Sequence, residues 1–160
     1  MIQLFNEDFF DAVKRIESES IDCIITDPPY NVLASRWDVK LDFSSMWKEF
    51  LRITKPPAAI CIFSSGLFTE SVFRNAPSGI YRYKWCWVKN TCTNFVQAHH
   101  RPMSRYEEIL VFSKASVANC AKLNMNYFPQ GLTKLTQKIK KRDKTNGKTM
   151  YTVLHRLKNG

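Results

Sequence analysis

Glycine is scarce in this sequence and widely spaced. The five glycines among its 160 residues are never closer than 13 positions to one another. A loop that cradles a phosphate or a nucleoside needs glycines close together, so that the backbone can approach the ligand. The sequence therefore excludes a glycine-rich cradle of this kind. The five are Gly66, Gly79, Gly131, Gly147 and Gly160.

Long apolar runs are also lacking. No run approaches the ~18 residues of a membrane span, and the start, Met1-Ile2-Gln3-Leu4, lacks the basic end and apolar middle of a signal peptide. These absences predict a cytoplasmic protein that does not enter a membrane.

Paired cysteines are absent as well. The five cysteines are odd in number and scattered, with no Cys-x-x-Cys pair, which predicts buried free thiols in a reducing compartment. His99 and His100 are neighbours whose side chains point apart, and no cysteine or carboxylate completes a ligand set. We therefore expect no metal site. The cysteines are Cys23, Cys61, Cys86, Cys92 and Cys120.

Acidic residues are almost missing from the carboxyl-terminal part. Residues 1–116 hold 14 Lys and Arg against 13 Asp and Glu, whereas residues 117–160 hold 10 against the single Asp143. The formal charge of +10 thus lies almost wholly at one end. A basic block of this kind is typical of a segment that follows the phosphates of a nucleic acid, and the alternative is a solvated tail. Its cations include Lys138, Lys140, Lys141 and Arg142.

What the chain does have is a regular succession of expected strands and helices. The apolar and alternating patterns predict five strands, at Ile2 to Phe5, Ile21 to Thr26, Ala58 to Phe63, Tyr81 to Val88 and Ile109 to Phe112. The strands at 21–26 and 58–63 are expected to be buried. Apolar residues at helical spacing predict a helix after Asp8, another after the expected N-cap Asp42, and a third after Gly66. This alternation predicts an α/β fold with a doubly wound, mainly parallel sheet.

The segment Asp27-Pro28-Pro29-Tyr30 directly follows the strand predicted at 21–26. Two prolines stop the strand and hold an acidic group and an aromatic ring in a stiff arrangement. Ligands of such sheets bind beyond the carboxyl ends of strands, where Asp27, Ser64 and Lys89 all fall. We therefore expect the three to converge on one face of the sheet.

This residue set suits methylation of an exocyclic amino group on a nucleobase. The nitrogen is a weak nucleophile because its lone pair is delocalised into the ring. The carboxylate of Asp27 and the carbonyl of Pro28 could accept hydrogen bonds from the amino hydrogens, and Tyr30 could stack on a base flipped out of the duplex.

The four residues resemble the catalytic motif of amino-methylating DNA methyltransferases, and Asp in the first position resembles the adenine-N6 branch. The likeness continues over roughly the first 114 residues, which are similar to the amino-terminal catalytic portion of a beta-class enzyme. It is carried by Leu4 to Asp8, Trp37-Asp38, Trp85-Cys86-Trp87-Val88-Lys89-Asn90, and Arg101 to Lys114.

The resemblance implies S-adenosylmethionine as cofactor, double-stranded DNA as partner, and an incomplete fold of the S-adenosylmethionine-dependent methyltransferase type. It implies a catalytic portion over 1–115 and the start of a target-recognition region over 116–160. The family's Phe-x-Gly-x-Gly cofactor turn is absent. Two alternatives therefore stay open: a non-catalytic remnant, or half of a split enzyme whose complementary chain, or a homodimer partner, supplies the turn. An RNA or small-molecule methyltransferase is a third.

The resemblance also implies roles for single residues. It puts the carboxylates of Asp8 and Asp27 near the cofactor, although the position of Asp8 also suits a helix N-cap. Lys89 matches the family's Trp-x-Lys lysine, and Arg101 lies in a segment that could touch phosphates, so both are DNA-binding candidates. Trp37-Asp38, in the loop after the site, is a candidate flap that closes on the base or the cofactor, and the alternative for Trp37 is packing against Trp47 or Trp85. Glu107 is expected to support the structure, with Arg101 and Arg105 within reach.

Overall fold

The computed structural model describes residues 2–31, 36 and 38–132. The chain forms two compact units, 1–126 and 127–160, and every helix and strand named below belongs to the first. The helices are α1 (Phe9–Ala12), α2 (Phe43–Ile53) and α3 (Leu67–Asn75), with 3₁₀ turns at Val13–Arg15 and Phe95–Gln97. The strands are β1 (Ile21–Thr26), β2 (Thr54–Ser64), β3 (Tyr81–Thr93) and β4 (Ser104–Phe112).

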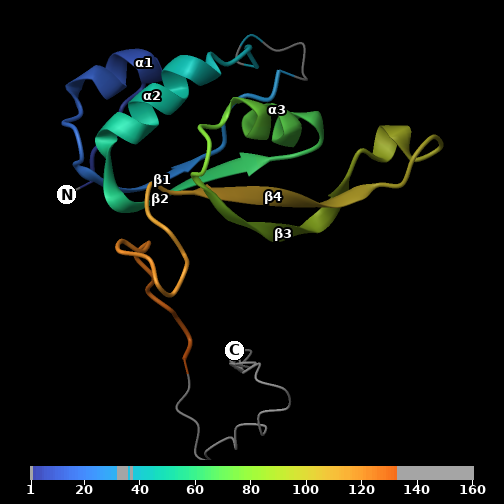
Figure 1. Cartoon of the computed structure of the whole chain (residues 1–160). Helices are drawn as coiled ribbons and strands as arrows, with labels where there is room; N and C mark the ends of the chain where they lie inside the picture. Colours follow the sequence, from blue (N-terminus) through green and yellow to red (C-terminus); the bar gives the residue numbers. More distant parts are fainter. Residues whose placement is uncertain (1, 32–35, 37, 133–160) are drawn as a thin grey trace, which may run out of the picture. The chain divides into compact units, whose positions relative to one another are not determined.

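The four strands form one sheet in the order β1-β2-β4-β3 (Figure 1). β1 and β2 are parallel, whereas β4 is antiparallel to both of its neighbours. The predicted α/β class is confirmed. The described sheet is mixed rather than mainly parallel, because β3 and β4 are consecutive in the sequence and joined by residues 94–103, and strands joined by so short a connection pair antiparallel.

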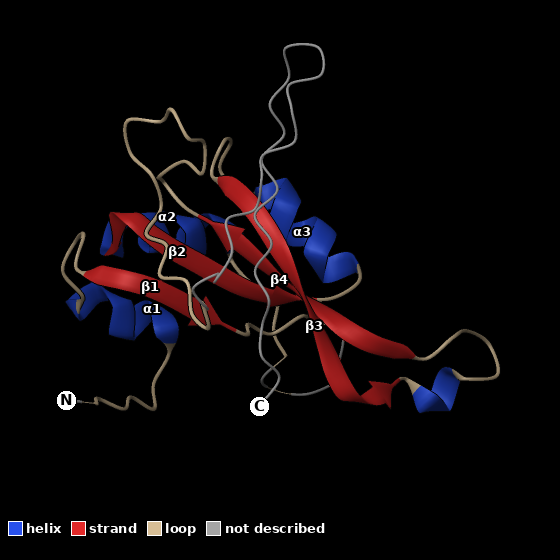
Figure 2. Ribbon diagram, turned by 90° about the horizontal axis from the view of Figure 1, so that it is seen from below, coloured by secondary structure: helices blue, strands red, loops and turns tan. Residues whose placement is uncertain are grey.

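All three described helices lie on the same side of this sheet (Figures 1 and 2). Between them and the strands is one apolar core, in which the ring of Trp47 from α2 meets that of Phe112 from β4 at 4.9 Å between centroids. The buried members of this core are Met46, Trp47, Phe50, Ile60, Ile62, Phe68, Val72, Leu110 and Phe112. None of the described helices is long and apolar enough to span a membrane.

Helix α2 forms where its capping residue and apolar spacing predicted it. The carboxylate of Asp42 accepts a hydrogen bond from the backbone N–H of Ser45 at 3.1 Å, which satisfies one of the free donors of the first turn. At the other end, the hydroxyl of Thr54 donates to the carbonyl of Phe50 at 2.7 Å. This helix fixes the position at which the loop after β1 returns to the core.

Three predictions about local structure were wrong. Ile2 to Phe5 form no strand, and Ile2 and Leu4 are about nine-tenths exposed. β1 is half-exposed rather than buried, because it is an edge strand with a described partner on one side only. Of the five cysteines only Cys61 is buried, although all five are free thiols.

Candidate active site

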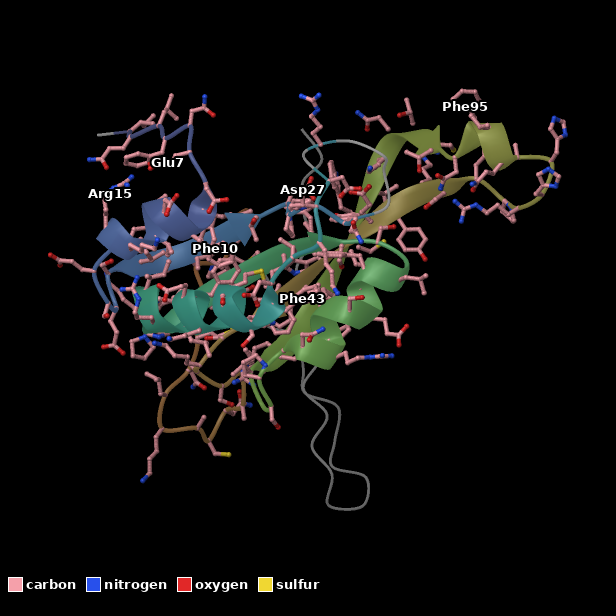
Figure 3. All side chains as sticks on the ribbon, turned by 90° about the horizontal axis from the view of Figure 1, so that it is seen from above. Glu7, Phe10, Arg15, Asp27, Phe43 and Phe95 are labelled. Carbon is pink, nitrogen blue, oxygen red and sulfur yellow. The ribbon has the colours of Figure 1, made fainter. Side chains whose placement is uncertain are left out.

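The predicted site segment lies at the carboxyl end of β1. Thr26, the last residue of this strand, pairs with Ile62 of β2, and the chain then leaves the sheet through Asp27 (Figure 3). The proline that follows cannot donate to a sheet ladder, which ends the pairing at this point. Asp27 is exposed, whereas Pro28, Pro29 and Tyr30 are half-buried. An acidic group is thus presented to solvent while the ring beside it is anchored.

Tyr30 is anchored by an aromatic stack. Its ring lies parallel to that of Phe68, with centroids 4.4 Å apart and planes inclined by 13°. Phe68 is buried in the first turn of α3 and is 6.0 Å from the ring of Phe43, the first residue of α2. The amino-terminal ends of two helices therefore hold the tyrosine at the end of β1.

The electrostatic surroundings keep the Tyr30 hydroxyl protonated. Burial raises the pKa of Tyr30 well above its usual value, and the negative charge of Asp27, hydrogen bonding to that carboxylate and the charge of Glu107 raise it further. The phenol remains a neutral donor at any physiological pH. Glu107 belongs to β4, next to the last residue that pairs with β2, so the site brings together groups from segments far apart in the sequence.

The chain after Tyr30 is turned back by Asp38. Asn31 has a positive φ of 56°, and its backbone N–H donates to Oδ1 of Asp38 at 2.5 Å. Asp38 is only 5% exposed. Asp38 belongs to the predicted Trp37-Asp38 flap, and its role as an acceptor for the loop backbone was not predicted, although an acidic residue a few positions after a tight turn is a common side-chain acceptor. Trp37, the candidate flap residue, lies outside the described residues.

The three predicted positions do share one edge of the sheet. β1, β2 and β3 run in the same direction, so Asp27, Ser64 and Lys89 lie toward the same end of the strands. Ser64 is fully buried and accepts a hydrogen bond from the Thr69 hydroxyl at 3.1 Å, which ties β2 to α3. Lys89 does not end its strand as expected, because β3 continues to Thr93.

Lys89 is held by a partner that the sequence analysis did not assign. Its ammonium group forms an ion pair with Glu107 of β4, and it lies 5.4 Å from the ring centre of Trp87. Glu107 thus makes a structural contact, as expected, but with Lys89 and not with the arginines that were expected within its reach. The strand register pairs Glu107 with Trp87, two positions before Lys89, whereas Arg105 donates from Nε to the carbonyl of Lys89 at 3.0 Å.

The other candidate residues lie apart from this site or outside the described residues. The Asp8 carboxylate accepts a hydrogen bond from the N–H of Phe10 at 2.8 Å, which makes it the N-cap of α1. Arg101 is exposed in the connection between β3 and β4. Lys138, Lys140, Lys141 and Arg142 lie outside the described residues. Within the described part of the chain, no three His, Cys, Asp or Glu side chains are grouped to hold a metal ion.

Fold and site together define an α/β protein with an acidic group and an anchored aromatic ring at the carboxyl end of β1. A family model for DNA methylases, N6_N4_Mtase, matches residues 21–159. The chain belongs to this DNA methylase family.

Individual relatives agree with this assignment. The type II methyltransferase M.HpaI of Haemophilus parainfluenzae is 30% identical over 112 residues, which cover 64% of this chain and 36% of that protein. The chain thus spans about a third of the length of this curated relative.

Two solved structures share the fold. The M1.HpyAVI–SAM complex has a TM-score of 0.53 at 24% identity, with 88% of this chain and 71% of that one covered. The cytosine-N4-specific PvuII DNA methyltransferase has a TM-score of 0.51 at 12% identity, with 68% and 48% covered. The predicted fold type, that of the S-adenosylmethionine-dependent methyltransferases, is confirmed.

Proposed function

We propose that this chain carries the target-base side of a DNA methyltransferase that methylates the exocyclic N6 of a flipped-out adenine. The observation that carries the proposal is the anchored Tyr30 beside the exposed Asp27, at the end of a strand in a DNA methylase fold. A base taken out of the duplex needs an aromatic surface and polar groups along its edge. This strand end offers both within four consecutive residues.

Each group of the site has a distinct task in this proposal. The carboxylate of Asp27 and the carbonyl of Pro28 accept hydrogen bonds from the amino group of adenine, which localises the nitrogen lone pair for attack on a methyl group. Tyr30 stacks on the base with the ring face that is not against Phe68. Pro29 keeps the two acceptors and the ring in a fixed relation.

S-adenosylmethionine is the proposed methyl donor, as in the M1.HpyAVI–SAM complex. The described residues do not fit this cofactor by themselves. The glycines in the described part of the chain, Gly66, Gly79 and Gly131, are 13 or more positions apart, so this part contains no cluster of glycines that could form a cofactor turn. Asp8 faces its own helix as a cap, and its cofactor contact rests on family likeness alone.

Adenine is preferred to cytosine because Asp27 occupies the first position of the motif, where the cytosine-N4 branch usually has Ser. The PvuII enzyme, a cytosine-N4 methyltransferase, shares the fold alone. For the DNA partner we propose contacts from Lys89, Arg101 and the basic block Lys138, Lys140, Lys141 and Arg142. The division into a catalytic portion over 1–115 and a recognition segment over 116–160 belongs to the same proposal.

One observation favours a second candidate: the glycines of the described residues are 13 or more positions apart and so do not form a glycine-rich turn. In that case the chain binds DNA without methylating it, or it works with a complementary chain or a second copy that supplies the glycine turn. The free thiols, four of them exposed, suit a reducing compartment, so the cytoplasm is the proposed location in either case.

Transfer of a labelled methyl group from S-adenosylmethionine to duplex DNA, RNA and free nucleotides tests the proposal. We expect label in duplex DNA. Transfer to RNA alone would overturn the DNA assignment. A calorimetric titration of S-adenosylmethionine into the chain separates the two candidates, because the second one predicts no heat of binding.

A further inference from the structure

Strands β3 and β4 extend beyond the rest of the sheet as a two-stranded arm. β2 ends at Ser64, which pairs with Glu108, so the part of β4 from Ser104 to Glu107 pairs only with β3. We define the arm as residues 87–106. Figures 1 and 2 show it projecting past the helices, with the 3₁₀ turn Phe95–Gln97 at its far end.

The arm is a built structure with its own hydrogen bonds. Between the pairs Val88–Tyr106 and Thr93–Ser104, β3 advances by five positions and β4 by two, so the register shifts by a bulge or irregularity. Bulges increase strand twist and occur often beside functional sites. The end of the arm is closed by backbone bonds, including those from the N–H groups of His100 and Arg101 to the carbonyl of Gln97 at 2.9 and 3.0 Å.

The arm carries positive charge and no negative charge. No Asp or Glu occurs in the sequence between Glu70 and Glu107, whereas the arm holds Lys89, Arg101 and Arg105. Glu107 neutralises Lys89 at its base. Arg101 is exposed and has no side-chain hydrogen bond or ion pair among the described residues. The outer part of the arm thus carries two cations, Arg101 and Arg105, and no acidic residue, which favours a polyanionic partner.

Apolar side chains at the tip face solvent. Phe95 is 75% exposed and Val96 is 76% exposed, and Figure 3 shows Phe95 at the far end of the arm, away from the core. These two neighbouring apolar side chains lie in the same outer part of the arm as Arg101, and exposed apolar patches with a polar rim are typical of a contact surface. In contacts with DNA, apolar side chains meet the thymine methyl group or enter between bases.

We propose that the arm lies in the major groove of duplex DNA beside the target base, with Arg101 and Arg105 on phosphates and the Phe95–Val96 tip against base edges. This rests on the proposed function, because it takes DNA as the substrate. A groove about 12 Å wide admits a two-stranded ribbon with a strand spacing of about 4.8 Å. The paired part of β4 beyond the sheet spans three residue steps, or about 10 Å, so the tip reaches DNA several base pairs from the flipped base.

The base of the arm connects it to the proposed site. Trp87 contacts Phe63 of β2 edge to face at 5.4 Å, and Glu107 both pairs with Lys89 and raises the pKa of Tyr30. DNA held by the arm is therefore held at a fixed distance from Asp27 and Tyr30. This arrangement lets a groove contact set which base reaches the site.

Fluorescence anisotropy with a labelled duplex of mixed sequence tests the arm directly. Arg101→Glu should weaken binding by about tenfold and reduce the slope of log affinity against log salt by about 1 or more. The double variant Phe95→Ser with Val96→Ser should also weaken binding while leaving that slope unchanged. Lys48→Glu, a charge reversal on the exposed face of α2, is the matched control and should bind as the unchanged protein does. Thermal unfolding checks that all variants fold.

Three outcomes overturn the arm proposal. If the arm variants bind the duplex as tightly as the unchanged protein, or if the unchanged protein does not bind it, the arm is not a DNA-binding element. If light scattering shows that the unchanged protein is a dimer and the Phe95→Ser, Val96→Ser variant a monomer, while both bind DNA equally well, the arm is an interface between two copies of the chain. Methyl transfer by the same proteins is a separate readout. If methyl groups are transferred but the arm variants bind DNA normally, only the arm proposal is contradicted. If the arm is needed for DNA binding but no methyl group is transferred, only the proposed function is contradicted.

Discussion

Tyr30 lies parallel to Phe68, with the two ring centroids 4.4 Å apart. Because Phe68 is part of the buried core and covers one face of the tyrosine, a base can stack only on the opposite face. The stack therefore does more than fill space: it fixes the plane in which a captured base must lie. That plane is set by the first turn of α3, although Tyr30 itself follows β1.

Removal of the Tyr30 ring should weaken capture of a base. We expect Tyr30→Ala to cost ~1–3 kcal/mol of binding to an extrahelical adenine analogue, the usual worth of one base stack. Tyr30→Phe keeps the ring and serves as the control. Quenching of 2-aminopurine fluorescence in an oligonucleotide measures the stack. Equal quenching by the Ala and Phe variants would show that the base does not stack on this residue.

Shortening Phe68 should act on the same stack from behind. Phe68→Leu removes an aromatic contact worth ~0.5–1.5 kcal/mol while it keeps an apolar side chain in the core. We expect a small loss in the free energy of unfolding together with weaker 2-aminopurine quenching. Val72 lies in the same helix and the same core but is not part of the Tyr30–Phe68 stack. Val72→Ala should therefore lower the free energy of unfolding without changing the quenching.

The Lys89–Glu107 ion pair should contribute more to stability than the neighbouring Lys84–Glu108 pair does. Both of its side chains are about four-fifths shielded, whereas Lys84, the partner of Glu108, is half exposed. Glu107→Gln should therefore cost about 1 kcal/mol and Glu108→Gln less, because exposed pairs are screened by water and salt. Urea unfolding of the two variants measures both losses. A larger loss for Glu108→Gln would contradict this ranking.

Alkaline pH should destabilise the fold through Cys61. Burial raises the pKa of this thiol from 9.0 to about 11, with a further contribution from Cys23. Between pH 9 and 11 the unfolded thiol ionises while the folded one stays protonated, so the free energy of unfolding falls as pH rises through this window. Cys61→Ala should flatten the decline, whereas Cys120→Ala, at an exposed position, should not. An unchanged slope in Cys61→Ala would place the titrating group elsewhere.

The basic block beyond the described residues should supply sequence-independent affinity for DNA. Lys140→Ala with Lys141→Ala should lower affinity for every duplex tested and reduce the salt slope by about 2, one for each lost phosphate contact. The same change at Lys14 and Lys48 is the control. If the slope keeps its value, the block is only a solvated tail.

Local signals predicted most of the fold. The strand at Ile21–Thr26 has the expected bounds, and α2 begins after its predicted N-cap Asp42. These elements depend on nearby residues: a proline pair ends the strand, and a capping carboxylate with regular apolar spacing begins the helix. The position of Asp27, Ser64 and Lys89 at one sheet edge followed from strand direction, which the order of elements already implied.

What failed depends on neighbours that a sequence does not name. The apolar run of β1 predicts a strand, but it does not show whether other strands pair with it on both sides. The exposure of β1 was therefore not predicted. The same holds for Cys23 and Cys86, which lie in strands yet face solvent. The Lys89–Glu107 pair and the arm both arise from the register of β3 against β4, which bulges and cannot be read from the period of either strand.

The most direct test of the central claim is mass spectrometry of nucleosides from duplex DNA incubated with S-adenosylmethionine and either the unchanged chain or Asp27→Ala. The account predicts N6-methyladenine with the unchanged chain and none with the variant, whose thermal unfolding stays the same because Asp27 is exposed. N4-methylcytosine, no methylated base at all, or equal methylation by the two proteins would contradict it.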